Sequence, residues 1–112
     1  MTIHQRAAQV WSILAWAATN RQTLTYEMVG RLTGLAAVGV GNALDPIQNY
    51  CASERLPPLT ALVVLKGTGA PSDGFIAAAD APAAQGRVFE FDWLGHGNPG
   101  PDAFRDAPQI EG

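Results

Sequence analysis

The side chains of this 112-residue chain that could do chemistry are few and lie far apart in the sequence. The single cysteine, Cys51, could be a nucleophile, but free cysteine is among the residue types most often buried. Neither histidine, His4 or His96, lies near it in sequence, so only the fold can bring them together. The histidines are also isolated from other ligand types, so we expect no metal site and no cofactor.

Two weaker combinations could also support catalysis. Ser53 or Ser72 could join His96 and an aspartate in a triad, but any chain of this length contains such residues. Glu90 and Asp92 could form an acid–base pair, although alternating acidic residues on a strand more often form a solvated face. Since no catalytic constellation stands out, we expect a protein that is not an enzyme.

Length and composition predict the class of protein. The chain has 112 residues, of which 47% are apolar, which suits a single domain over 1–112. No apolar run approaches the roughly 18 residues of a transmembrane helix, and no signal peptide is recognisable. We therefore expect no contact with a membrane. Because a lone cysteine cannot form an internal disulfide, we expect a reducing, cytoplasmic setting.

The charged residues are unevenly distributed around a net charge of −3. Residues 1–70 carry five basic and three acidic side chains, a net charge of +2, whereas residues 71–112 carry two basic and seven acidic ones, a net charge of −5. Neutralisation of phosphates by basic groups drives binding to nucleic acids. The first part therefore permits binding to duplex DNA, and the acidic remainder favours a protein partner or self-association.

The first 20 residues form the predicted N-terminal helix, over 3–19, with Thr2 as its N-cap. Trp16 lies off the apolar stripe of this helix. It either packs beneath the C-terminal segment or is an exposed anchor for a protein partner.

The stretch 22–75 predicts two short helices, a glycine turn between them, an apolar strand and a glycine-rich turn. Thr25 is the expected N-cap of the first short helix, and Gly34 is expected to end it. This order of elements predicts an α+β fold, a small, mainly helical winged helix-turn-helix domain with a short β-sheet wing. The expected elements are helices over 26–33 and 36–44, a strand over 60–65 and a turn over 66–74. A further helix over 46–54 is expected either to begin at Pro46 or to continue from the preceding helix at an angle.

The remaining residues are expected to support this winged-helix core. Residues 76–86 predict a short helix or a surface excursion. An extra strand is predicted over 87–93, because Phe89, Phe91 and Trp93 alternate with polar residues. Residues 95–112 are a glycine- and proline-rich tail, with a helical turn near 101–105 and a frayed end.

Several motifs of the stretch 22–75 are similar to the DNA-binding domain of a known family. They resemble the O6-alkylguanine-DNA alkyltransferases and their non-catalytic alkyltransferase-like relatives over about half the chain. The resemblance implies a winged-helix fold that binds duplex DNA. The matching pieces are Thr25-Tyr26, Val40-Gly41-Asn42-Ala43-Leu44, Val63-Val64, Gly69 and Gly74-Phe75.

The departures from the family pattern bear on the chemistry. The family's nucleophilic cysteine would fall near Leu59 or Thr60, and neither can accept an alkyl group as a thiolate does. The family's intruding arginine falls at Val38. Tyr26 is kept, and in the family this tyrosine helps to displace the target nucleotide. The resemblance therefore implies a base-flipping scaffold without its reactive and strand-separating groups.

Two hypotheses about function follow. In the first, the chain is a non-enzymatic DNA-binding protein. In the second, it is a protein-interaction or regulatory module on the same scaffold that acts on a nucleic-acid-handling partner, with Trp16 as the binding anchor. The DNA contacts expected under the first hypothesis are Tyr26, Arg31, Val38, Asn42 and Lys66.

Overall fold

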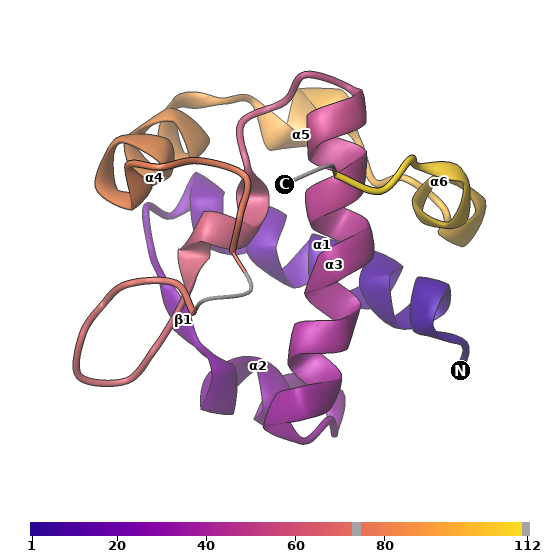
Figure 1. Ribbon diagram of the computed structural model, residues 1–112, viewed down its shortest axis with the longest axis horizontal. Helices are drawn as coiled ribbons and strands as arrows, with labels where there is room; N and C mark the ends of the chain where they lie inside the picture. Colours follow the sequence, from indigo (N-terminus) through magenta and orange to yellow (C-terminus); the bar gives the residue numbers. More distant parts are fainter. Residues whose placement is uncertain (73–74, 111–112) are drawn as a thin grey trace.

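A mainly helical α+β fold is present in the computed structural model, which describes residues 1–72 and 75–110 (Figure 1). This class agrees with the sequence-based prediction. The elements are α1 (Ile3–Thr19), β1 (Leu24–Thr25), α2 (Tyr26–Thr33), α3 (Ala37–Ser53), the 3-10 helix η1 (Leu59–Leu62), β2 (Val63–Val64), α4 (Ala81–Glu90), α5 (Trp93–His96) and α6 (Pro101–Asp106).

Helix α1 has the bounds and the cap that the sequence predicts. The Thr2 hydroxyl accepts a hydrogen bond from the Gln5 amide, and the Gln5 side chain accepts one from the Thr2 amide. The apolar face of α1 packs against α3 and η1. Trp16 is 61% exposed, so it does not pack beneath the C-terminal segment.

Helix α2 is also confirmed with its predicted caps. The Thr25 hydroxyl accepts a hydrogen bond from the Met28 amide, and Gly34 ends the helix with a φ of 78°. Arg6 of α1 donates a 2.6 Å hydrogen bond to the carbonyl of Thr33. Since this carbonyl lies in the last turn of α2, the bond fixes the end of α2 against α1.

Helix α3 is one continuous element that spans both of the stretches predicted over 36–44 and 46–54, so the second stretch continues the first and does not begin a new helix. Pro46 lies inside it. An internal proline costs a helix about 3 kcal/mol. A long buried face compensates for that cost and keeps the two halves together; its members are Val40, Ala43, Leu44, Ile47, Gln48 and Cys51.

The sheet differs from the predicted β-wing. Only Val63–Val64 of the predicted strand over 60–65 is extended, and it pairs in parallel with Leu24–Thr25. The chain turns after Leu65, whose amide donates to the carbonyl of Ala70. Within the described residues, this turn does not connect two paired strands. The predicted return of the chain at 74–75 lies partly outside the described residues.

The extra strand predicted over 87–93 is wrong, because these residues end α4 and begin α5. Asp80 caps α4 by accepting from the Ala83 amide, and Asp92 caps α5 by accepting from the Gly95 amide. The alternation of aromatic residues therefore results from two consecutive helices. The Trp93 indole donates to the carbonyl of Val88, which closes the link between them.

The core is centred on Trp11 of α1. Its ring lies 5.5 Å from those of Tyr50 and Trp93 and 5.8 Å from that of Phe104. Phe104 belongs to α6, so this part of the predicted tail packs on the core, while residues 111–112 lie outside the described residues. The Ile110 amide also donates to the side chain of Asn49 on α3.

Candidate functional site

An open groove lies along α2, at its junction with α3. Its volume is about 780 Å³. Three of the predicted DNA-contacting residues, Tyr26, Arg31 and Lys66, line it. The remaining lining residues are Glu27, Gly30, Gly34, Leu35, Ala36 and Ala37. The fold thus brings together side chains that are up to 40 positions apart in the sequence.

The N-terminus of α3 lies at this groove. Ala36 supplies no side-chain hydrogen bond to the first turn of α3, and that turn contains no acidic residue. The first amides of a helix have no partner within the helix, and its N-terminus carries a partial positive charge. The groove therefore presents amide donors beside two basic side chains.

One acidic side chain opposes these positive groups. The Glu27 carboxylate lies 4.0 Å from the Lys66 ammonium, and both side chains are strongly exposed, at 68% and 78%. Such exposed pairs contribute about 0–1 kcal/mol. Glu27 therefore holds Lys66 only weakly.

The two other predicted DNA contacts lie on the exposed surface of α3 and do not line the groove. Val38 is 75% exposed, and Asn42 is exposed one helical turn further along. Residues four apart in a helix share a face, so these two side chains point the same way.

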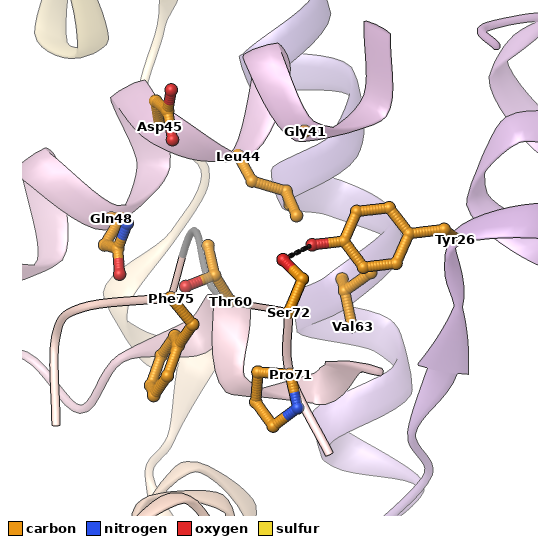
Figure 2. A pocket seen from close by; sticks show the side chains of 10 residues that line it. All are labelled: Tyr26, Gly41, Leu44, Asp45, Gln48, Thr60, Val63, Pro71, Ser72 and Phe75. Carbon is orange, nitrogen blue, oxygen red and sulfur yellow. Dashed lines mark hydrogen bonds between the residues drawn. The ribbon is translucent and has the colours of Figure 1, made fainter. Parts of the chain in front are cut away.

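A second, smaller cavity lies on the other side of Tyr26, with a volume of about 50 Å³. Figure 2 shows its side chains converging from α2, α3, η1 and the segment that follows β2. The Tyr26 hydroxyl is 2.8 Å from that of Ser72, so this pair closes one side of the cavity. Tyr26 is therefore a wall shared by the cavity and the groove.

Thr60 lines this cavity and is 4% exposed. Its hydroxyl has no hydrogen-bond partner among the described residues. Gln48, on α3, also lines the cavity, and its side-chain oxygen accepts from the amides of Ile76 and Ala77. These two bonds fasten the segment after β2 onto α3.

The electrostatics of the cavity are those of a neutral or weakly acidic site. Among the described residues that line it, Asp45 is the only one with a formal charge, and partial burial raises the pKa of that carboxyl. Since no lysine, arginine or histidine lines the cavity, it offers an anion no compensating charge.

The residues considered for catalysis do not come together. Cys51 is buried, and burial raises the pKa of its thiol to about 12, so the thiolate needed for attack is disfavoured. Ser72 pairs with Tyr26, whereas His96 pairs with Tyr50. Asp92 caps α5 and so is not the partner of Glu90 on a strand face.

Residues 1–72 and 75–110 contain neither a candidate metal site nor a candidate membrane span. No group of three or more His, Cys, Asp or Glu side chains is placed to hold a metal ion. Within the same ranges, no helix combines the length and the apolar character needed to cross a bilayer.

Comparison of the chain with known protein families, with curated proteins and with solved structures finds no match. The resemblance to alkyltransferase-like domains therefore stays a prediction, and the function must be argued from geometry. Sequence reasoning named Thr60 only as the position of a missing cysteine, and it missed the Tyr26–Ser72 pair. No local pattern marks this pair, because its members are 46 residues apart.

Proposed function

We propose that this chain binds duplex DNA without catalysing a reaction, through a helix-turn-helix pair formed by α2 and α3. The observation that carries the proposal is the convergence of Tyr26, Arg31 and Lys66 on one groove at the N-terminus of α3. Helices α2 and α3 pack together and are joined by a three-residue turn, 34–36, as in a helix-turn-helix pair.

The groove suits a DNA phosphate. A phosphate oxygen can accept from the free amides of the first turn of α3, while Arg31 and Lys66 neutralise its charge. With that contact in place, the exposed face of α3 would meet the bases. Asn42 is the residue there with both a donor and an acceptor, so it is the expected reader of an adenine edge.

The cavity behind Tyr26 offers no nucleophile suited to alkyl transfer among its described residues. The alkyltransferase resemblance places the nucleophile near Leu59 or Thr60; only Thr60 lines the cavity, and a threonine hydroxyl has no thiolate-like reactivity. The one thiol of the chain, that of Cys51, is buried with a raised pKa. Binding, and not alkyl transfer, is therefore the activity that these residues support.

The proposal is tested by fluorescence anisotropy of a labelled duplex, titrated with protein at several salt concentrations. Changing Arg31→Gln together with Lys66→Gln should reduce the slope of log affinity against log salt by about two, because each phosphate contact contributes about 0.9. The matched control is Arg87→Gln with Arg105→Gln, which removes the same charge from α4 and α6, away from the groove (Figure 1). No binding at low salt, or equal losses in the two double variants, would contradict the proposal.

Glu27→Gln provides a second test, in which the affinity for the duplex should rise instead of fall. It removes the carboxylate that competes for Lys66, so affinity for the duplex should rise by about two- to fivefold at low salt. Unchanged or weaker binding would show that Lys66 does not meet a phosphate.

A second candidate function rests on Trp16. We propose it as the anchor of a protein-interaction module, because an indole 61% exposed on α1 is unusual in the absence of a partner and tryptophan is enriched at binding hot spots. The partner would be a second copy of the chain or a nucleic-acid-handling protein. Light scattering and pull-down with the wild type and Trp16→Ala test it. If neither variant associates with anything, this candidate is lost.

A further inference from the structure

The cavity behind Tyr26 contains a buried polar group that the described part of the protein leaves unsatisfied. The Thr60 hydroxyl lies at its wall, 4% exposed and without a partner there. Buried hydroxyls are nearly always hydrogen-bonded, because leaving one unpaired destabilises the folded state. A ligand that enters this cavity would find a free donor and acceptor in place.

The remaining walls define what kind of ligand fits. Leu44, Val63 and Phe75 contribute apolar surface, and the Tyr26–Ser72 pair contributes hydroxyls. An anion is disfavoured, since none of the described lining residues is basic and Asp45 is one of them. A cation is less well matched than a neutral molecule, because Asp45 is exposed and its carboxylate can be hydrated instead of facing a ligand in the cavity.

The size of the cavity limits the ligand further. A volume of about 50 Å³ holds roughly four water-sized spheres. It therefore suits a molecule of a few non-hydrogen atoms, or the end of a longer one that leaves through the open side.

We infer that this cavity is a binding site for a small uncharged molecule that has a hydroxyl or carboxamide head and a short apolar body. The head pairs with the Thr60 hydroxyl, and the body lies against Leu44, Val63 and Phe75. This site is separate from the proposed DNA groove, although Tyr26 borders both.

Binding is measured by two-dimensional NMR of the full chain, titrated with acetamide and with 1-propanol. The expected result is saturable shifts confined to the cavity, at Gly41, Leu44 and Val63. Acetate and methylammonium serve as charged probes of similar size and should produce no saturable shift there. If no neutral probe gives saturable local shifts, or if acetate binds as well as acetamide, the inference is overturned.

Thr60→Val tests the role of the hydroxyl, since valine keeps the shape of the side chain and removes its oxygen. It should weaken acetamide binding by about fivefold or more. Thr23→Val, an exposed position outside the cavity, should leave the affinity unchanged. Equal affinities in wild type and Thr60→Val would contradict the assignment.

A second variant blocks the cavity itself. Gly41 lines it, and a side chain added there meets no atom within 4 Å. Gly41→Val should therefore fold and should weaken acetamide and 1-propanol alike. Full binding by a folded Gly41→Val would place the ligand elsewhere and would overturn the inference. Because none of these titrations contains DNA, their outcome is independent of the proposed function.

Discussion

At the scale of single residues, two buried threonines differ in how their hydroxyls are satisfied. The Thr33 hydroxyl donates a 2.8 Å bond to the carbonyl of Val29 and accepts from the Leu35 amide. The Thr60 hydroxyl has no partner among the described residues. The two positions thus form a natural comparison between a paired and an unpaired hydroxyl.

Replacing each threonine by valine should therefore change stability in opposite directions. Thr60→Val should raise the free energy of unfolding by about 1 kcal/mol in the absence of ligand, because it removes an unsatisfied group. Thr33→Val should lower it by about 1–2 kcal/mol, because it breaks two bonds and leaves the Leu35 amide unpaired. Urea unfolding followed by circular dichroism measures both. A loss of stability in Thr60→Val would mean that its hydroxyl has a partner in the free protein.

Cys51 makes stability depend on pH in the alkaline range. The pKa of its thiol rises from an ordinary value of 9.0 to about 12 on folding, so the unfolded chain releases this proton first. The contribution of the thiol to stability is complete below pH 9 and is lost as pH rises toward 12. The steepest loss is about 1.4 kcal/mol per pH unit.

Cys51→Ala should remove this part of the pH dependence. Unfolding free energies of wild type and variant, measured from pH 7.5 to about 11, should converge as pH rises, because only the wild type loses the thiol contribution. Burial, Glu54 and Cys51 all raise the pKa of Tyr50, so its ionisation affects both proteins and differs between them only by the part that Cys51 contributes. Parallel curves would contradict the raised pKa.

At the scale of elements, Gly30 fixes the approach of α2 to the turn that precedes α3. A Cβ added there would lie 2.6 Å from the backbone oxygen of Leu35. Gly30→Ala should therefore destabilise the protein by about 1–2 kcal/mol and weaken binding at the groove, because the turn must move. Gly86→Ala, inside α4 with no atom within 4 Å, should instead stabilise by about 0.5–1 kcal/mol. Thermal unfolding compares the two, and equal effects would refute the packing argument.

The elements that the sequence predicts well are those defined by local signals. Thr2 and Thr25 cap α1 and α2, and Gly34 ends α2 in the left-handed region, as expected. The predictions fail where packing between residues far apart in the sequence determines the secondary structure. Pro46 is accepted inside α3 because a long apolar face holds the helix together, and the strand expected over 87–93 is a pair of helices that bury Val88 and Trp93.

At the scale of the whole molecule, the C-terminal segment is part of one core with α1 and α3. Phe104 is 2% exposed and lies beside Trp11 and Tyr50. Phe104→Ala should lower the free energy of unfolding by about 3–5 kcal/mol, whereas Leu94→Ala, at an exposed position, should change it by less than about 0.5 kcal/mol. Denaturant unfolding measures both, and a small effect of Phe104→Ala would mean that the tail folds separately.

At this scale, the sequence predicts residues of the groove but not the cavity. Arg31 and Lys66 could be named from residue type and their place in a presumed helix-turn-helix, and the fold does bring them to one groove. The cavity was not predictable, because its lining comes from four separate segments. The parallel pairing of β1 with β2, which draws these segments together, has no local signature either.

Pro46 weakens the backbone hydrogen bonding in the middle of α3. Because proline has no amide hydrogen, the carbonyl of Asn42 receives no hydrogen bond from residue 46, and the helix lacks one backbone hydrogen bond at this point. Both halves are anchored in the core, the first through Val40 and Ala43 and the second through Ile47 and Cys51, and the first half also carries the exposed Val38 and Asn42. Bending is therefore cheapest at residues 42–46. A bend at this point would change the angle of the exposed face of α3, but it would also have to move the buried Val40.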